Sequence, residues 1–323
     1  MTQPLVHFVI LNWNQPELTA ACLDSLSRQE YRNFRIVLVD NGSSDASVAF
    51  FRERYPGVTL IEQHPNIGYS PGNNLGIEYA LTQKTDYIFL LNNDTEVHPQ
   101  MLSMLMAVAE SDSRVGAVGP TMYYHDPANM IWAGENHIDW PGARLLRSHF
   151  GEFDHGHLTK ECAPRPVDCI DTCAILIKRH VFEKVGLLNA DYFINYDDLD
   201  LNLRIARAGF SMLYVPQAKM WHKVSATMGQ ASPATTYYMT RNALLLFWTQ
   251  APGIFKYISV ARILGRTLRP TLAWTVRRKY RNDFFRRKRT ANLFAMRDFF
   301  LKRFGRMGSD VENACCGRQP APS

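Results

Sequence analysis

The stretch YIFLLNND, residues 87–94, joins a short apolar run to three polar residues. A run that is apolar on both faces is typical of a strand buried in a parallel sheet that helices cover on both sides. In such sheets, ligands bind outside the carboxyl ends of the strands. Asn92, Asn93 and Asp94 therefore stand where a ligand is expected.

Similar apolar runs recur on both sides of this stretch, at 6–11, 34–39 and 58–61. Helical patterns separate them at 16–28, 45–55, 71–82 and 99–110. Further strands are expected at 115–123, 167–177 and 211–215, with a helix at 197–208. The alternation predicts an α/β fold: a mixed, mostly parallel, Rossmann-like sheet flanked by helices.

The net charge of +6 is unevenly distributed. Residues 256–306 contain sixteen Lys or Arg and two acids, so the rest of the chain carries a net −8. This segment is also rich in aromatic residues, and we expect a basic helical tail there. An anionic membrane surface suits such a mixture best. The alternatives are a helical appendage packed on the main domain and a nucleic-acid surface, and the last is not expected.

The six cysteines have irregular spacing, which predicts buried, reduced thiols rather than a disulfide framework. Neither a secretory signal nor an apolar stretch of membrane-spanning length is expected. The predicted location is the cytoplasm, peripheral on the cytoplasmic face of the inner membrane.

Two polar clusters suit a nucleotide. Asp40 and Asn41 follow a strand and could accept the imide N–H of uracil or thymine, while Trp13 offers a flat face for the base. The structural alternative is a helix cap in the same turn, from Ser44 or Asp45. The glycine-rich turn 66–76 precedes a helix whose free N–H groups suit phosphate, although a tight loop explains it as well.

Asn92 and Asp94 can both reach one hard cation, Mg²⁺ or Mn²⁺, that neutralises a diphosphate leaving group. The alternative is an Asx turn. His222 follows a strand-like segment and is either structural, a further metal ligand or a diphosphate contact. Asp197 and Asp198 open a helix and could be simple caps, yet three acids in four positions exceed what capping needs. Asp198 and Asp200 do not share a helix face, so one carboxylate could face the substrate and take the proton of an acceptor hydroxyl, while Asp200 is expected to pair with Arg204.

The chain resembles the family-2 inverting glycosyltransferases of the GT-A fold, in particular the bacterial rhamnosyltransferase-like branch. The resemblance covers residues 6–247 and rests on VILNWN, LVDNGSSD, NIGYSPGNNLGI, YIFLLNNDTEV, VGAVGP, VFEKVGLL, YFINYDDLDLNLRIARAG and YYMTRNALLLF. It implies a nucleotide site at Leu11, Trp13, Asp40, Asn41, Asn66, Gly68, Asn73, Asn92 and Asn93. It further implies a metal site at Asp94 and His222, Asp198 as the catalytic base, and an acceptor region at Asp171, Thr172 and Asp197.

By this resemblance, residues 1–235 form the GT-A domain, with a nucleotide-binding half at about 1–120 and an acceptor half at about 121–235. The basic helical region then covers 236–308, and 309–323 are expected to be disordered. The implied reaction transfers a hexose, rhamnose before others, from a dTDP- or UDP-linked donor to a lipid-linked or cell-surface glycan, in cell wall or polysaccharide biosynthesis. The rivals are a nucleotidyltransferase and a non-catalytic sugar- or lipid-binding module.

Three departures from the family pattern concern the metal and the acceptor. Asn92 replaces the first acid of the metal motif, which leaves Asp94 as the main ligand. Asp171 and Thr172 stand where small residues are usual, which reshapes the expected acceptor pocket. Asn189 replaces an acid that would otherwise contact the acceptor.

Overall fold

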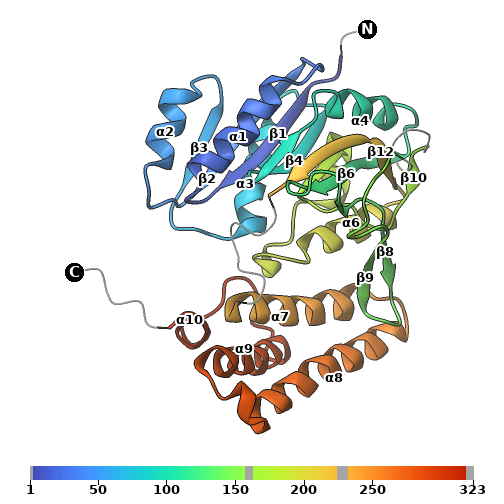
Figure 1. Ribbon diagram of the computed structural model, residues 1–323. Helices are drawn as coiled ribbons and strands as arrows, with labels where there is room; N and C mark the ends of the chain where they lie inside the picture. The colour runs from blue at the N-terminus through green and yellow to red at the C-terminus, as the bar shows by residue number, and fades with distance from the viewer. Residues whose placement is uncertain (1–2, 157–162, 224–231, 318–323) are drawn as a thin grey trace. The chain divides into compact units, whose positions relative to one another are not determined.

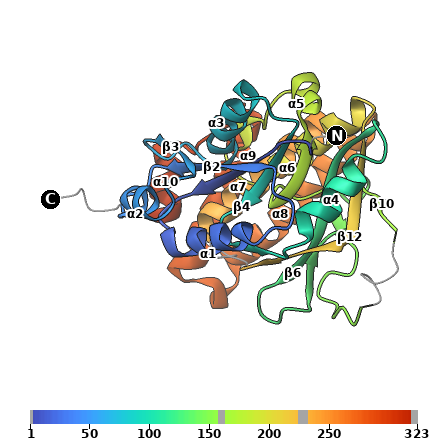
Figure 2. The ribbon, with the colours of Figure 1, turned by 90° about the horizontal axis from the view of Figure 1, so that it is seen from above.

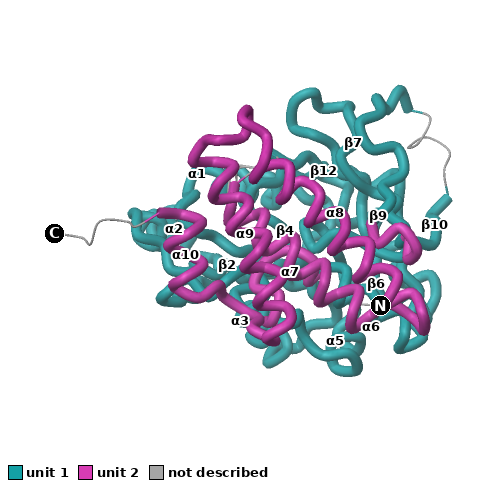
Figure 3. Tube along the Cα trace, turned by 90° about the horizontal axis from the view of Figure 1, so that it is seen from below, with its two compact units in different colours: residues 1–138, 145–189, 198–224 teal, residues 139–144, 190–197, 225–323 magenta. Residues whose placement is uncertain are grey.

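The computed structural model describes residues 3–156, 163–223 and 232–317. The chain forms two compact units, shown in different colours in Figure 3. Unit 1 comprises residues 1–138, 145–189 and 198–224, and unit 2 comprises 139–144, 190–197 and 225–323.

Unit 1 is built on a ten-stranded sheet (Figure 1). Its strands are β1 (Val6–Asn12), β2 (Phe34–Asn41), β3 (Thr59–Gln63), β4 (Tyr87–Asn92), β5 (Thr95–Val97), β6 (Val115–Tyr124), β7 (Ile131–Ala133), β10 (Arg165–Pro166), β11 (Ala174–Lys178) and β12 (Ser211–His222). The order along the sheet is β10-β12-β6-β11-β4-β1-β2-β3, with β5 on β12 and β7 on β6. Strands β4, β1, β2 and β3 are parallel to one another, and the antiparallel β11 separates them from the parallel pair β6 and β12. The predicted mixed, mostly parallel sheet is confirmed.

Helices cover both faces of the sheet. They are α1 (Pro16–Ser27), α2 (Ser47–Arg54), α3 (Tyr69–Thr82), α4 (Met101–Ala109), α5 (Arg179–Val185) and α6 (Asp197–Arg207). In Figure 2, α1 and α4 lie on one side of the central strands, and α3 and α5 lie on the other. Along β4, alternate side chains enter two separate cores: Phe89 joins α1 and α4, and Ile88 joins α3 and α5. This two-sided burial explains why the strand is apolar throughout.

Helix α3 approaches the sheet unusually closely at its first turns. A side chain at Gly72 would place its Cβ 2.8 Å from Leu11 Cδ1 and 3.0 Å from Asn41 Nδ2, so both of these side chains would have to shift. Gly68, which precedes the helix, has φ +102°, a conformation that glycine adopts readily. The glycines of 66–76 thus let the start of α3 reach the strand ends.

Unit 2 is mainly helical. Its elements are the short 3₁₀ turn η1 (Ala190–Tyr192), α7 (Pro233–Gln250), α8 (Phe255–Val276), the 3₁₀ turn η2 (Arg278–Tyr280), α9 (Asp283–Phe300) and α10 (Ser309–Cys316). Ser232 caps α7 by accepting a hydrogen bond from Thr235 N (3.0 Å), and Asn282 caps α9 in the same way. The predicted C-terminal helical region is therefore present.

Three expectations differ from the structure. The strand expected at 167–177 covers only Ala174–Lys178, because the Asn202 side chain takes the place of a neighbouring strand at Ile170, with hydrogen bonds of 3.1 and 2.9 Å to its N–H and C=O. Strand β12 continues beyond the expected 211–215 to His222 through a bulge between Val215 and Lys219. Part of the segment expected to be disordered, Ser309–Cys316, is helix α10, while 318–323 lie outside the described residues.

Four cysteines, Cys22, Cys169, Cys173 and Cys315, are buried and free, as the sequence predicts. Cys316 is exposed, and Cys162 lies outside the described residues. The hairpin β8 (Asn136–Asp139) and β9 (Arg144–Arg147) forms a second, two-stranded sheet.

Candidate active site

The carboxyl ends of β1, β2 and β4 meet in register, as parallel pairing requires. Asn12 pairs with Asp40, and Leu11 pairs with Asn92. The polar residues that follow the three strands therefore lie at one edge of the sheet. This placement positions every predicted nucleotide residue of β1, β2 and β4 around one location.

Asp40 is completely buried, and its carboxylate is held by the protein itself. Oδ1 accepts from Ser43 N (2.9 Å), while Oδ2 accepts from Asn12 Nδ2 (2.8 Å) and Ser43 Oγ (2.7 Å). Asn12 in turn accepts from Thr19 Oγ1 (2.7 Å) on α1. These bonds fix the turn after β2, and the contact between Asp40 and a base stays a prediction.

Asn41 ties the same strand end to the glycine-rich loop. Its Oδ1 accepts from Ile67 N (3.1 Å), and its Nδ2 donates to Gly68 O (2.9 Å) and Asn66 Oδ1 (3.4 Å). Trp13, by contrast, is 43% exposed at the end of β1. A large aromatic ring left in solvent at a strand end suits stacking on a planar ligand.

The remaining predicted nucleotide residues also take part in internal hydrogen bonds. Asn73 donates to Tyr69 O (2.9 Å) within α3, and Asn93 donates to Thr19 Oγ1 (2.9 Å) on α1. Asn92 Oδ1 accepts from the Tyr69 hydroxyl (2.8 Å). These contacts couple α1 and α3 to the end of β4.

Asp94 and His222 are brought together by strand pairing. The antiparallel register of β5 and β12 places Thr95 opposite His222, and the preceding Asp94 then reaches the imidazole. His222 Nε2 lies 3.1 Å from Asp94 Oδ1, and both side chains are buried. The ring of Trp132 packs edge-on against His222, with the ring centroids 4.5 Å apart.

The donor set at Asp94 and His222 fits a divalent cation that is shared with a substrate. Within the described residues, no group of three or more His, Cys, Asp or Glu side chains could hold a metal ion. Mg²⁺ and Mn²⁺, however, are commonly held by one or two protein ligands together with substrate phosphate oxygens and water. One carboxylate and one imidazole facing each other match that kind of site.

Asp171 and Thr172 lie beside this site, in the segment that precedes β11. Asp171 is buried, and its carboxylate accepts from Asn136 Nδ2 (2.9 Å) and Arg147 Nη2 (3.1 Å) of the hairpin β8–β9. Thr172 O and Oγ1 lie 3.2 and 3.3 Å from the Tyr69 hydroxyl. Asp171 and Thr172, two of the three predicted acceptor residues, are therefore fixed by neighbours.

Asp198 is the second residue of α6, directly after the buried Asp197. Its Oδ1 accepts from Leu199 N (2.8 Å). Burial and the nearby Asp171 carboxylate raise the pKa of Asp198 to about 6, whereas the Leu199 N–H and Arg147 oppose the rise. A carboxylate with such a pKa is ionised at neutral pH and is a better proton acceptor than an ordinary one. The expected pair of Asp200 with Arg204 is confirmed, with Arg204 Nε 2.9 Å from Asp200 Oδ2.

A closed ring of contacts joins the predicted metal residues to the predicted acceptor residues. From Asn92 the ring passes through the Tyr69 hydroxyl to Thr172 and Asp171, and from there to Arg147. The Arg147 guanidinium lies 4.7 Å from the centre of the Trp132 ring, which packs on His222. The members of the ring are Asn92, Asn93, Asp94, His222, Trp132, Arg147, Asp171, Thr172 and Tyr69. Burial first, and then the Asp94 and Asp171 carboxylates, raise the pKa of the Cys173 thiol.

Four members of the site are missing from the sequence predictions: Arg147, Trp132, Asn136 and Tyr69. Arg147 and Asn136 come from a hairpin with no catalytic spacing, and a lone Arg or Asn carries no signal of its role. Tyr69 stands inside the glycine-rich stretch that the sequence singles out. Its place beside Gly68 is the one local signal that could have indicated it.

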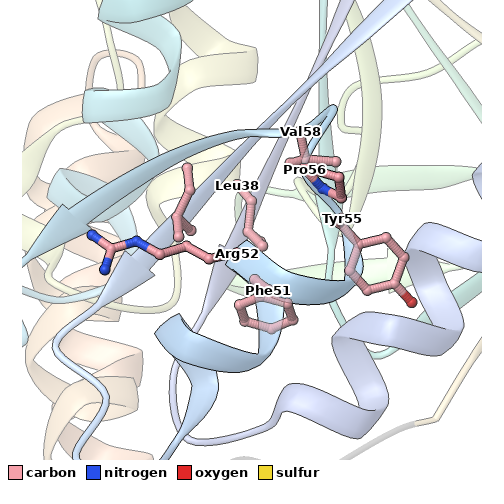
Figure 4. Close-up of a pocket in the computed structure, with 7 residues that line it drawn as sticks. Leu38, Phe51, Arg52, Tyr55, Pro56 and Val58 are labelled. Carbon is pink, nitrogen blue, oxygen red and sulfur yellow. The ribbon is translucent and has the colours of Figure 1, made fainter.

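Unit 1 also contains a small, mainly apolar pocket that is separate from the candidate site. It lies between α2 and the strands β2 and β3, as Figure 4 shows. Its lining is mainly apolar: Leu38, Phe51, Arg52, Tyr55, Pro56, Val58 and Leu60. None of these is a predicted site residue, so this pocket is separate from the ring of contacts.

The sequence model of the family described as glycosyl transferase family 2 matches residues 8–186, more than half of the chain. The chain belongs to glycosyl transferase family 2. The match includes the ends of β1, β2 and β4 together with Asp171, and the prediction of a glycosyltransferase is confirmed.

Curated relatives of this family-2 chain include two rhamnosyltransferases. The N-acetylglucosaminyl-diphospho-decaprenol L-rhamnosyltransferase of Mycobacterium tuberculosis is 26% identical over 261 residues, which cover 71% of this chain and 81% of the relative. The dTDP-rhamnosyl transferase RfbF of Shigella flexneri is 24% identical, over 75% of this chain and 79% of the relative. The uncharacterized protein y4gI of Sinorhizobium fredii is 29% identical over 242 residues, which cover 70% of this chain. The same residues cover only 25% of the length of y4gI.

Solved structures show the same fold at low sequence identity. The mannosyltransferase PcManGT of Pyrobaculum calidifontis, in complex with GDP-Man and Mn²⁺, has a TM-score of 0.57 at 16% identity, over 94% of this chain and 88% of that one. GalNAc-T7 with UDP, GalNAc and Mn²⁺ has a TM-score of 0.60 at 15% identity, over 93% of this chain and 57% of that one. The family-2 chain has the predicted GT-A fold.

Proposed function

We propose that this chain transfers a hexose from a nucleoside-diphosphate sugar to an acceptor hydroxyl, by a single displacement that inverts the anomeric centre. The observation that carries the proposal is the match of residues 8–186 to glycosyl transferase family 2, together with Asp198, a carboxylate in the first turn of α6 whose pKa burial and the Asp171 carboxylate raise to about 6. In a glycosyltransferase, such a group suits the role of the base that activates the acceptor.

The reaction is a balanced exchange at the anomeric carbon. Asp198 accepts the proton of the acceptor hydroxyl while the acceptor oxygen bonds to the anomeric carbon. The bond from that carbon to the diphosphate oxygen breaks on the opposite face, and its electron pair leaves with the nucleoside diphosphate. Asp171 and Arg147 position the acceptor side of this exchange, and Trp13 and the loop 66–68 are the proposed contacts of the nucleotide.

A divalent cation, Mg²⁺ or Mn²⁺, held by Asp94 and His222 would neutralise the charge that develops on the leaving diphosphate. Two similar GT-A structures contain Mn²⁺, which supports this assignment. Asn92 is auxiliary, because the Tyr69 hydroxyl already donates to its side-chain oxygen.

The leading donor is dTDP-rhamnose, followed by UDP-linked sugars. The two rhamnosyltransferases among the relatives support rhamnose, and the name of one of them includes a lipid-linked sugar. A lipid-linked or cell-surface glycan is therefore the proposed acceptor, in cell wall or polysaccharide biosynthesis.

The experiment is a transfer assay with a panel of dTDP- and UDP-sugars and Mn²⁺, in which the released nucleotide and the glycosylated acceptor are both quantified. Asp198→Asn is expected to lower kcat by at least about 10³-fold, since the base is lost, while donor affinity changes less than about twofold. Asp168→Asn is the matched control, because Asp168 is an exposed carboxylate in the same segment as Asp171. Transfer that survives in Asp198→Asn contradicts the base assignment. A nucleotide attached to the acceptor would instead indicate the rival nucleotidyltransferase, and donor binding without any transfer would indicate a binding module.

We further propose that the basic region 256–306 lies on an anionic membrane surface. Among the described residues, no helix is long and apolar enough to cross a membrane. Helix α8 instead has one face turned inward at Ser259, Ile263, Thr267 and Thr271. The opposite face exposes an apolar stripe at helical spacing: Ile254, Tyr257, Ala261, Leu268, Leu272 and Val276.

Exposed cations border this stripe on one side, with Arg262, Arg266 and Arg269 on the same helix. An exposed apolar stripe bordered by cations suits the interface of an anionic bilayer. Leu268→Glu and Leu272→Glu are expected to lower flotation with phosphatidylglycerol vesicles by roughly tenfold. Leu146→Glu is the control, since Leu146 is 43% exposed and Leu268 is 41% exposed. Equal flotation of all three variants and the wild type, or no flotation of the wild type, would contradict the membrane proposal.

A further inference from the structure

The segment just before Asp198 has an unusual backbone. Phe193, Asn195 and Tyr196 have φ values of +63°, +66° and +70°. Residues other than glycine rarely adopt this left-handed conformation, and only asparagine among these three tolerates it well. Such backbone persists where surrounding structure enforces it, and it is concentrated at functional sites. Something must therefore hold this segment in place.

Asn242 on α7 supplies part of that hold. Its side chain is completely buried, and Nδ2 lies 2.8 Å from Tyr192 O, 2.7 Å from Ile194 O and 3.0 Å from Asn195 O. One side-chain amide thus bonds three main-chain carbonyls within four residues. The three carbonyls can face the same amide because the chain turns back on itself at the residues with positive φ.

Arg241, the preceding residue, supplies the rest. It is also completely buried, and its Nη2 donates to Asp191 O (3.0 Å) and Tyr192 O (3.2 Å). Its Nε and Nη2 donate to Asn242 Oδ1 at 3.0 and 2.8 Å, which fixes the orientation of that amide.

The rings around Arg241 reinforce this arrangement. The guanidinium lies over Tyr237 and Tyr238, 5.3 and 5.1 Å from their centres. Phe193 stacks on Tyr238 with the ring centres 5.1 Å apart. A buried cation destabilises the fold unless its donors are hydrogen-bonded. The Arg241 guanidinium meets this requirement in part by binding carbonyls of this segment, and it thereby holds the segment in place.

We propose that Arg241 and Asn242 are positioning residues for Asp198. By holding residues 191–196, of which Phe193, Asn195 and Tyr196 are in the left-handed conformation, they set where α6 begins and how the Asp198 carboxylate is oriented. The two residues and the segment they hold belong to the same compact unit, unit 2, and Asp198 follows that unit's stretch 190–197 directly in the chain (Figure 3). This inference rests on the proposed role of Asp198 as the base.

Asn242→Asp is the first test, because it keeps the shape and the oxygen that Arg241 contacts but replaces the amide donor with an oxygen that faces three carbonyls. We expect kcat to fall roughly 10- to 100-fold, since a misplaced base loses alignment, while KM for the donor changes less than about twofold. Thr240→Val is the control on the same helix: Thr240 Oγ1 bonds Asn292 (3.1 Å), so the variant loses one hydrogen bond away from the segment. A merely structural role would lower the melting temperature and the yield of folded enzyme, and would leave kcat per folded enzyme unchanged.

A second pair of variants tests the backbone without altering the two positioning residues. Asn195 Nδ2 has no hydrogen-bond partner among the described residues, so Asn195→Ala and Asn195→Gly each remove a side chain whose donor is unused. Alanine resists φ +66° and glycine does not. We expect kcat of Asn195→Ala to be on the order of fivefold below that of Asn195→Gly. This comparison stays decisive if Asn242→Asp fails to fold.

The outcomes separate this inference from the proposed function. An unchanged kcat in folded Asn242→Asp, or equal kcat in the two Asn195 variants, overturns the positioning role while the loss of transfer in Asp198→Asn still stands. Full transfer in Asp198→Asn overturns the base assignment and the positioning role with it.

Discussion

Arg147 Nη2 lies 3.1 Å from Asp171 Oδ1, and the ion pair is close enough to Asp198 for both members to influence its pKa. Burial and then Asp171 raise the pKa of Asp198, whereas Arg147 lowers it. Both charges come from elements other than α6: Arg147 from the hairpin β8–β9 and Asp171 from the segment before β11. Beyond the effect of burial, residues distant in the sequence therefore tune the basicity of the proposed base.

Asp171→Asn is expected to shift the acid limb of the pH profile of kcat to lower pH. Transfer requires ionised Asp198, so in the wild type activity falls as the pH drops through about 6. Removing the neighbouring negative charge makes ionisation easier, which lowers the pKa and preserves activity at pH 5. Burial still acts on Asp198, so the limb remains above the range of an ordinary carboxyl. The measurement is kcat at saturating donor and acceptor from pH 4.5 to 8, and an unmoved limb would refute the coupling.

Arg147→Gln is expected to move the same limb in the opposite direction and to destabilise the fold. It removes the positive charge that lowers the pKa of Asp198 and leaves the buried Asp171 carboxylate without its cation. The free energy of unfolding should fall by about 2 kcal/mol, less than for a fully buried pair because the Arg147 side chain is 29% exposed.

A double-mutant cycle separates these effects from simple loss of packing. In Asp171→Asn, no carboxylate remains that needs the Arg147 cation. Adding Arg147→Gln should therefore lower the free energy of unfolding much less than it does in the wild type. Urea unfolding of the four proteins at pH 7.5 measures the coupling. Strictly additive losses would show that the ion pair contributes nothing beyond its separate contacts.

The sequence predicts the central sheet because each strand of that region is a short apolar run with a polar end. Tyr87–Asn92 shows the pattern most clearly, since alternate side chains enter two cores and the chain then turns polar. Parallel pairing then brings the polar ends of neighbouring strands to one edge of the sheet. Asp94 and Trp13 could therefore be placed without a structure.

The other half of the site depends on long-range pairing that local patterns do not encode. Arg147 reaches Asp171 across 24 positions, and His222 reaches Asp94 across 128, through the register of β12 with β5. The same limitation explains why the expected strand at 167–177 is too long: Asn202, far along the chain, occupies the position at Ile170 where a strand partner would bond. Contacts of this kind follow from topology rather than from spacing.

Trp13→Ala is expected to weaken nucleotide binding by roughly tenfold, because stacking of a base on an aromatic ring is worth about 1–3 kcal/mol. Trp248→Ala is a closely matched control, since both rings are 43% exposed and Trp248 belongs to unit 2. Isothermal titration with the nucleoside diphosphate and Mn²⁺ gives both affinities directly. If Trp13 stacks on the base, its variant should lose the same affinity for dTDP and for UDP, because every base presents a flat face, and Trp248→Ala should lose none. A normal affinity in Trp13→Ala would place the base elsewhere along the edge formed by β1, β2 and β4.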